Sequence, residues 1–439
     1  CNVKDKGVKI IPEANELELL ITFSRTMENM PYDPETCMDD TKSYWHGFWE
    51  QGGMIRLRNS IDKRALELER RIILSMYLLA AQCAGNMPPQ ETGLSVNSWY
   101  GKFHLEMHLW HQAYLPMWNR GRTLKKSLLW YEEHLNDAKQ NAAKNGFTGA
   151  RWPKMVSETA VDSPSPVAPL LVWQQPHILY MLELCYHENP SEDFLKDHID
   201  LVTETSEFMA DFPARNEKDK KYHLLPPISP AQECHNPENT KDPAFELEYF
   251  VSGLTIAIEW YKRLDRPVPQ KWLDVINNMA ESPVMNGKYQ AHANCPDTFK
   301  TAATDHPSML CAYGLIDSGR IDRQIMKNTL EAVIEDWDYD SLWGWDFAVM
   351  AMTAARLGLK GKAIDLLLAD TPKNRYVKSG NNAQGKRQDL PLYLPGNGSL
   401  LLAMPLLVAG VEGKLGECAG FPDDGTWCVE YEDINKCPC

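Results

Sequence analysis

The sequence predicts an all-α fold, an (α/α)6 toroid in which six helical hairpins close into a ring. Two observations lead to this prediction. From residue 60 onward, apolar residues recur at helical spacing in twelve segments separated by clusters of Pro, Gly and Asn. The connections between these segments alternate between short and long. Since short links join antiparallel neighbours, the twelve helices pair into six hairpins, and the long links emerge together at one end.

The expected helices carry apolar stripes at spacings of three and four residues, as Ala65, Leu68, Ile72 and Met76 do in the first of them. They cover residues 61–84, 104–117, 123–145, 170–187, 191–211, 243–264, 270–281, 306–317, 321–334, 346–357, 360–369 and 399–411. The short links are 118–122, 188–190, 265–269, 318–320 and 358–359, and the long ones are 85–103, 146–169, 212–242, 282–305, 335–345 and 370–398. Because functional residues concentrate on loops held by a rigid scaffold, we expect the site where the long links meet.

The first sixty residues have a different pattern. Val8, Ile10, Leu17 and Leu19 alternate with charged residues, which predicts one or two strands between 8 and 23, followed by a linker. A single strand is not stable alone, so this segment should pair with a sheet outside the chain or pack on the ring. We therefore divide the chain into an N-terminal strand and linker segment (1–45), the toroid (46–415) and a C-terminal extension (416–439).

Composition narrows the class of partner. A net charge of -15 and a pI near 5.3 argue against binding to nucleic acid or an anionic membrane. No run of 18 apolar residues is present, so we expect no transmembrane segment. The 14 tryptophans and 17 tyrosines favour a carbohydrate ligand, because their rings offer flat apolar faces with a polar edge. Cys1 is either the lipid-bearing first residue of an extracytoplasmic lipoprotein or the point where a fragment begins, and we expect an extracytoplasmic protein.

The strongest local segment runs from Leu225 to Phe250, LPPISPAQECHNPENTKDPAFELEYF, a proline-rich loop that enters an amphipathic helix. Glu233 lies in the loop, where the preceding prolines limit the conformations open to it. A glycosidase needs one carboxylic acid that donates a proton to the leaving oxygen, and Glu233 is our candidate. The alternative is an ordinary solvated glutamate, and Glu238, Glu246 and Glu248 lie nearby.

Three further segments carry candidate residues. Residues 93–111, GLSVNSWYGKFHLEMHLWH, place His104 and His108 four apart, which suits a metal or a buried hydrogen-bonded pair; since HExxH is absent, we expect no metal and no organic cofactor. For the base opposite the acid we consider Asp346, in WDYDSLWGWDF, and Asp389, in RQDLPLYLPGNGS. Asp346 could equally cap a helix.

At these residues the chain resembles the six-hairpin glycosidases, most closely glycoside hydrolase family 65, with some features of family 95. GLSVNSWYGKFHLEMHLW is similar to the family 65 pattern GLSGEGYRGHVFWDTEIF, which puts Glu106 at the family's sugar-contacting aspartate and His108 at the next glutamate. Residues 149–153, GARWP, are similar to GARYP. PPISPAQECHN takes the place of VIGPDEYHE, whose glutamate is the general acid, and the match falls on Glu233.

The resemblance also implies a β-sandwich ahead of the ring, with residues 1–25 as its last strand. The chain departs from the family 95 pattern at the catalytic base, because Pro395 of PGN stands where that family has the aspartate of DGN. Hydrolysis and phosphorolysis both remain open, since Lys386, Arg387 and Ser399 could bind phosphate.

We therefore expect an inverting glycoside hydrolase with Glu233 as acid and Asp389 or Asp346 as base. Alternatives are a phosphorylase of the same fold and a catalytically silent glycan-binding domain. The expected substrate-binding residues are Trp99, Tyr100, Glu106, His108, Arg151, Trp152, Gln232, His235, Trp343, Trp345 and Asn397.

Overall fold

The computed structural model describes residues 2–4, 7–10, 15–22, 33–163, 165, 167–385 and 387–438, which fall into two compact units, Cys1–Gly52 and Gly53–Cys439. In the first unit, strands β1 (Asn2–Lys4) and β2 (Gly7–Lys9) form an antiparallel hairpin. Helix α1 (Pro34–Glu50) begins where the Asp33 side chain accepts a hydrogen bond from the Thr36 amide, at 2.8 Å. The expectation of strands over 8–23 is met only by β2, because residues 15–22 form no strand; residues 11–14 and 23 lie outside the described part.

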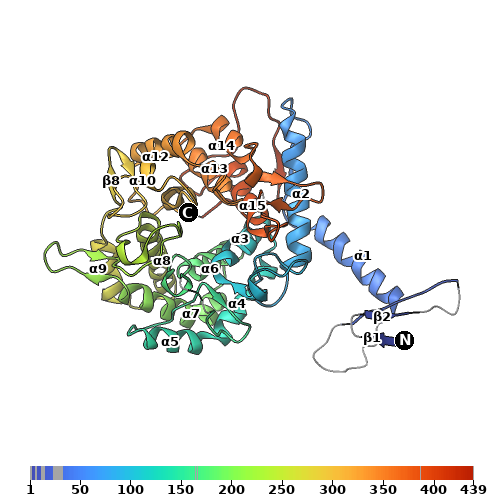
Figure 1. The fold of residues 1–439 in the computed structure, drawn as a ribbon, viewed down its shortest axis with the longest axis horizontal. Coiled ribbons are helices and arrows are strands. Elements are labelled where there is room, and N and C mark those ends of the chain that lie inside the picture. The colour runs from blue at the N-terminus through green and yellow to red at the C-terminus, as the bar shows by residue number, and fades with distance from the viewer. Residues whose placement is uncertain are drawn as a thin grey trace. The chain divides into compact units, whose positions relative to one another are not determined.

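The second unit is a closed double ring of helices (Figure 1). Six inner helices contact one another in order, and the last contacts the first: α3 (Leu105–Gln112), α6 (His177–Glu188), α8 (Ala244–Arg263), α11 (Cys311–Gly314), α13 (Asp346–Arg356) and α15 (Leu394–Val408). The outer helices are α2 (Arg64–Gln82), α4 (Gly121–Glu133), α7 (Glu192–Asp211), α9 (Gln270–Asn278), α12 (Arg323–Asp336) and α14 (Lys360–Leu367). The predicted (α/α)6 toroid is therefore confirmed.

Burial separates the two rings. Every residue of α3, α13 and α15 is buried, whereas α2 and α4 bury one face only, as amphipathic outer helices do. Gly398 lets α15 lie directly against α3, because a Cβ at this position would stand 1.8 Å from the Trp110 carbonyl oxygen. The close contact between these two inner helices thus depends on Gly398, the second glycine of the PGNG segment.

Several helix boundaries differ from the expectation. The helix expected over 170–187 begins only at His177, and the one over 104–117 ends at Gln112 and is followed by a 3-10 turn (Leu115–Trp118). The segment 123–145 is two helices, α4 and α5 (Leu135–Lys144), with His134 between them. The expected helix over 306–317 is a 3-10 turn (Ser308–Leu310) followed by the four-residue α11. Helix α15 starts at Leu394, earlier than expected. Pro395 is tolerated there because it occupies the first turn, where a backbone N–H has no partner within the helix.

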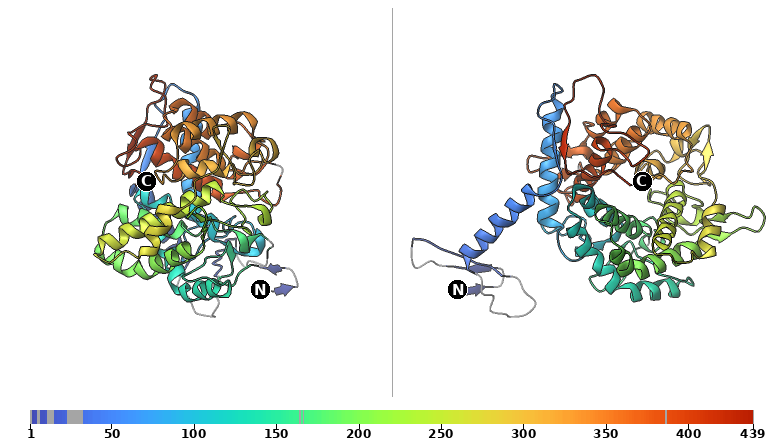
Figure 2. Two further views of the ribbon diagram at one scale, coloured as in Figure 1. Left: turned by 90° about the vertical axis from the view of Figure 1, so that its left-hand side faces the viewer. Right: turned by 180° about the vertical axis from the view of Figure 1, so that it is seen from behind.

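The two ends of the ring differ. At the end with the short links, β12 (Glu430–Glu432) pairs with β3 (Met54–Arg56), and the amides of Asn435 and Cys437 donate to the carbonyls of Met117 and Gly410. Two further views show the ring from the side and from behind (Figure 2). No helix in the described residues is long and apolar enough to cross a membrane.

At the other end, the long links contain short antiparallel strand pairs that stiffen them. These are β4 (Phe103–His104) with β5 (Met155–Val156), β6 (Ala214–Arg215) with β7 (Tyr222–His223), β8 (Val284–Met285) with β9 (Lys288–Tyr289), and β10 (Arg375–Tyr376) with β11 (Asn382–Ala383). The short helix α10 (Thr298–Thr301) lies in the link between α9 and α11.

Candidate active site

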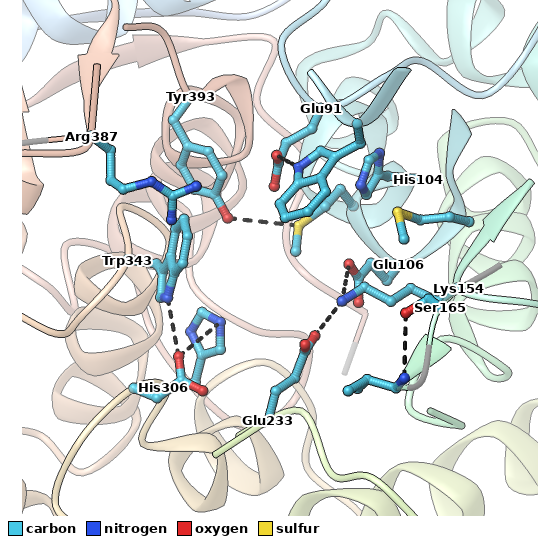
Figure 3. Close-up of a pocket in the computed structure, with 15 residues that line it drawn as sticks. Glu91, His104, Glu106, Lys154, Ser165, Glu233, His306, Trp343, Arg387 and Tyr393 are labelled. Atoms are coloured by element: carbon cyan, nitrogen blue, oxygen red, sulfur yellow. Dashed lines mark hydrogen bonds and ion pairs between the residues drawn. The ribbon is translucent and has the colours of Figure 1, made fainter. Parts of the chain in front are cut away.

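A cavity of about 300 Å³ opens at the long-link end of the ring, and all six long links contribute side chains to it (Figure 3). This is where functional residues were expected from the alternation of link lengths. Four carboxylates, two basic groups, two histidines and three aromatic rings share the space. The lining residues are Glu91, Trp99, His104, Glu106, Met107, Lys154, Met155, Ser165, Val167, Glu233, Asp305, His306, Trp343, Arg387 and Tyr393.

One wall of the cavity holds a charged triad of Glu106, Lys154 and Glu233 (Figure 3). The Lys154 Nζ lies 3.2 Å from Glu106 Oε1 and forms a second ion pair with Glu233 Oε1. Burial alone would lower the pKa of Lys154, but the two carboxylates hold it above its ordinary value. Burial raises the pKa of Glu106 to about 8, so this carboxyl group retains its proton at neutral pH. Its Oε2 is buried and has no hydrogen-bond partner among the described residues, so it is available to a ligand hydroxyl.

The loop that carries Glu233 is anchored by the two residues that precede it. The Ala231 amide donates to the buried Glu246 carboxylate at 2.6 Å. Next to it, the Gln232 side-chain amide donates to the carbonyls of Ala302 and Thr304, at 2.7 and 2.8 Å. Glu233 itself keeps 34% of its side chain exposed, toward the cavity. The loop is therefore fixed to its surroundings, while the Glu233 carboxyl group stays accessible.

Glu91 lies across the cavity from Glu233 (Figure 3). The indole Nε1 of Trp99 donates to Glu91 Oε2 at 2.5 Å. Trp99 has a left-handed backbone with φ of 50°, which bulky side chains rarely adopt and which is common at functional sites. Burial raises the pKa of Glu91 to about 7.

A third group of polar side chains surrounds His306. Its Nδ1 lies 3.0 Å from Asp346 Oδ1, and its Nε2 lies 3.7 Å from Asp305 Oδ1. Burial opposes protonation of this ring, but the two aspartates raise the pKa of His306 to about 9. The ring also stacks on Trp345, with centroids 4.0 Å apart. His306 is therefore a protonated imidazole that faces the cavity between two carboxylates.

The aromatic face beside His306 is lined with cations. The indole Nε1 of Trp343 donates to Asp305 Oδ1 at 3.0 Å. Lys373 Nζ lies 4.5 Å and the Arg387 guanidinium 5.7 Å from the centre of the Trp343 ring. This side of the cavity thus combines an indole with positive charge.

Of the residues expected to form the site, Trp99, Glu106, Glu233 and Trp343 line the cavity. Several others are buried behind its wall and hold it in shape. His108 lies 2.9 Å from the Tyr131 hydroxyl, and Asn397 donates to Ser75 Oγ at 2.8 Å. Trp345 stacks between Trp110 and His306, Gln232 anchors the acid loop, and Asp346 accepts from the Trp343 amide at 2.7 Å.

The structure does not bring the remaining expected residues to the cavity wall. Asp389 is 64% exposed and is drawn into an ion pair with Arg387, at 2.6 Å. Tyr100 is 93% exposed. Arg151 donates to the Pro169 carbonyl, and the Trp152 indole donates to Thr205 at 3.1 Å.

His235, also expected to bind substrate, instead faces His292, with 3.2 Å between the two ring nitrogens. Burial lowers the pKa of His235 and of His292 to about 4, so both rings are neutral.

Among the charged and aromatic cavity residues, sequence reasoning missed Glu91, Lys154, Asp305, His306 and Tyr393, and it considered Arg387 only as a possible phosphate ligand. Lys154 directly follows the GARWP segment, and Asp305 and His306 end a long link just before a helix. Polar residues at those junctions were a usable signal, because link ends face the mouth of the ring.

Comparison with known proteins supports the fold. No protein-family model matches the chain, and no curated protein matches its sequence. Among solved structures, a protein assigned as a kojibiose phosphorylase from the human microbiome superposes with a TM-score of 0.70 at 10% identity, over 89% of this chain and 62% of that one. A wild-type glycosidase, and a glycosidase variant in complex with glucose, each superpose with a TM-score of 0.59 at 13% identity, over 78% of this chain and 98% of theirs.

The chain therefore spans 62% of the length of the first of these proteins. At such identities the likeness concerns architecture, and function must come from the site. The resemblance to six-hairpin glycosidases that the sequence motifs indicated is confirmed at the level of the fold, an (α/α)6 toroid.

Proposed function

We propose that this chain is the catalytic part of a carbohydrate-active enzyme that cleaves glycosidic bonds with Glu233 as the proton donor. The observation that carries the proposal is the position of Glu233, an accessible carboxyl group on an anchored loop, in a cavity with three other carboxylates and three aromatic rings. Acid-assisted glycoside cleavage needs a positioned acid and a second carboxylate beside the sugar. A proton donor must carry a proton, so we expect substrate to displace Lys154 from Glu233 while Lys154 keeps its contact with Glu106.

Glu91 is the best-placed partner for the opposite step. It lines the cavity across from Glu233, and its pKa of about 7, raised by burial, suits a group that takes a proton from water near neutral pH. Asp389 points to solvent and Asp346 is held by His306 behind the wall, so neither has direct access to a water molecule in the cavity. We assign inversion to this pair, which requires carboxyl groups roughly 6.5 to 9.5 Å apart in the substrate complex.

The sugar would be recognised by one buried carboxyl oxygen that can bind a hydroxyl group and by three aromatic rings that can stack on it. Glu106 Oε2 lacks a partner and is suited to a sugar hydroxyl, whose binding would satisfy it. Trp99, Trp343 and Tyr393 supply rings for the apolar faces of the sugar. The cavity has the volume of a small-ligand site, which favours attack at a chain end over attack within a long polymer.

Phosphorolysis is the second candidate, favoured by the cations near Trp343. Arg387 lines the cavity, Lys373 lies beside the same indole, and His306 is protonated. Together they offer charge-assisted hydrogen bonds to an oxyanion. A phosphate bound there would replace the activated water and leave Glu91 without a catalytic role.

The test is to incubate the protein with α- and β-linked disaccharides and aryl glycosides, with and without phosphate, and to follow the released anomers by NMR. Inverted product in the absence of phosphate, lost in Glu91→Gln, supports hydrolysis as proposed. Sugar phosphate formed only with phosphate supports the second candidate. Sugar binding without turnover on any substrate would overturn both and favour a silent glycan-binding domain.

A further inference from the structure

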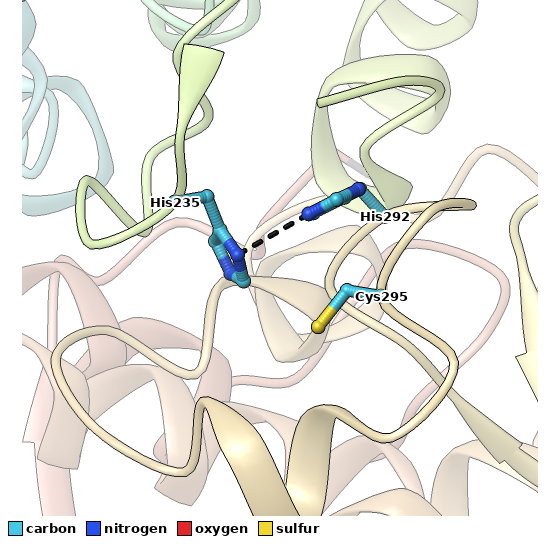
Figure 4. Close-up of side chains that lie close together, drawn as sticks. All are labelled: His235, His292 and Cys295. Atoms are coloured by element: carbon cyan, nitrogen blue, oxygen red, sulfur yellow. Dashed lines mark hydrogen bonds between the residues drawn. The ribbon is translucent and has the colours of Figure 1, made fainter. Parts of the chain in front are cut away.

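Three potential metal ligands meet next to the acid loop but outside the cavity wall (Figure 4). They are His235, two residues after Glu233, and His292 and Cys295, from the link that ends at Asp305 and His306. One ligand atom from each lies within 4.8 Å of those of the other two. The cluster therefore joins the two segments that carry the carboxylates on this side of the cavity.

The spacing of the two imidazoles fits a single tetrahedral ion. Zinc binds histidine nitrogen at about 2.0 to 2.1 Å, so two nitrogens on one tetrahedral zinc stand about 3.3 Å apart. His235 Nδ1 and His292 Nε2 are 3.2 Å apart. The Cys295 sulfur lies beside the two rings (Figure 4), within 4.8 Å of a ligand atom of each.

The cluster is not a closed hydrogen-bond network by itself. The Asn294 amide donates to His292 Nδ1 at 3.2 Å, and the other nitrogen of that ring, Nε2, faces His235 Nδ1. Among the described residues, His235 Nε2 has no hydrogen-bond partner although it is buried. A metal ion between the two rings would replace the contact between them, at the cost of the long Asn294 contact.

The types of ligand select the class of ion. Two imidazoles and one thiol suit zinc and similar borderline divalent ions, whereas calcium and magnesium need oxygen ligands. Three protein ligands leave a fourth position for water. Cys234 is adjacent to His235, but it is exposed and its sulfur is not one of the three clustered ligand atoms.

We propose that His235, His292 and Cys295 bind one zinc ion, which fastens the loop of Glu233 to the link of Asp305 and His306. The ion has a positioning role, since it lies off the cavity wall and touches none of the reacting groups. This differs from the expectation of no metal, which considered His104 with His108 and the C-terminal cysteines but not this cluster. The proposal does not depend on glycosidase activity, because it concerns ion binding.

The test starts from protein treated with chelator and then dialysed with a thiol reductant. Zinc is titrated against wild type, Cys295→Ser, His292→Gln and the matched control Cys234→Ser, and the bound metal is measured by elemental analysis. We expect one zinc per chain in wild type and Cys234→Ser. Affinity should fall by more than about 100-fold in the other two variants, since changes outside the ligand shell already cost about 10- to 100-fold. Cobalt substitution should give a thiolate-to-metal charge-transfer band that Cys295→Ser lacks.

Two readouts keep the outcome interpretable. Circular dichroism and thermal melting in chelator show whether each variant folds like wild type before zinc is added. Zinc should then raise the melting temperature of wild type and Cys234→Ser but not of Cys295→Ser. Equal zinc binding by wild type and Cys295→Ser, loss of binding in Cys234→Ser, or no stoichiometric zinc in wild type would each overturn the proposal.

Discussion

Replacing Glu106 with glutamine should change how the stability of the protein depends on pH. Glu106 is buried in the charged triad, and its pKa is raised by burial from the ordinary 4.5 to about 8. The folded state therefore holds this proton in a range where the unfolded chain has released it. Stability from this group is complete below about pH 4.5 and is lost as pH rises through about 8. Glutamine has nearly the same shape, keeps an oxygen for Lys154 and does not titrate.

The magnitude follows from the two pKa values. Each unit between them corresponds to about 1.36 kcal/mol, so the free energy of unfolding of wild type should fall by up to about 4 to 5 kcal/mol relative to Glu106→Gln between these limits. The assay is urea denaturation of both proteins at intervals from about pH 5 to pH 8.5, with the slope m held as a check on the unfolded state.

The difference between the two free energies is the informative curve. This difference should decline steadily with pH, by about 1.36 kcal/mol per pH unit, which corresponds to one proton, and should level off above about pH 8. Glu246→Gln is the matched control, because Glu246 is also buried but its pKa is raised only to about 7, so its curve should level off earlier. A flat difference for Glu106→Gln across this range would refute the assignment of a protonated Glu106.

Three further predictions concern residues away from the triad. Asp389→Asn should leave turnover and melting temperature close to wild type, because the Asp389 carboxylate is exposed and pairs with Arg387 on the surface; a large loss of turnover would restore its candidacy as the base. Gly398→Ala should lower the free energy of unfolding by about 1 to 3 kcal/mol or more, since its Cβ would meet the Trp110 carbonyl, and wild-type denaturation midpoints would contradict this. Glu183→Gln should flatten the loss of stability between about pH 4.5 and 2, because arginine and histidine partners lower the pKa of Glu183 to about 2 and its stabilisation disappears as acid protonates it; an unchanged acid profile would count against that.

Much of the architecture could be predicted from the sequence, because link lengths and apolar stripes are local properties. The same pattern predicted that the site lies where the long links meet. Motif similarity strengthened the candidacy of Glu233, which its loop had already indicated, and gave Glu106 a role in sugar binding. Trp99 and Trp343 were expected from composition and loop position, and both line the cavity.

Side-chain direction within a long loop could not be predicted in the same way. Asp389 and Arg387 lie two residues apart, yet only the arginine lines the cavity. The Asp389 side chain is 64% exposed and pairs with the arginine from the solvent. Lys154 directly follows the GARWP segment, but its partners Glu106 and Glu233 lie far from it in the sequence. His235 and His292 are 57 positions apart, so their contact depends on how two links fold over the ring.

The most direct test of the central claim compares Glu233→Gln with wild type on two glycosides of the same sugar, chosen from those that wild type cleaves. One has a sugar leaving group that needs a proton, and the other has a dinitrophenyl group that departs without one. General acid catalysis by Glu233 predicts a loss of about 10²- to 10⁴-fold in kcat on the first and a much smaller loss on the second. Glu238→Gln, a change to an exposed carboxylate nearby, should behave as wild type. Equal losses on both glycosides, or full activity of Glu233→Gln on the first, would contradict the assignment of Glu233 as the proton donor.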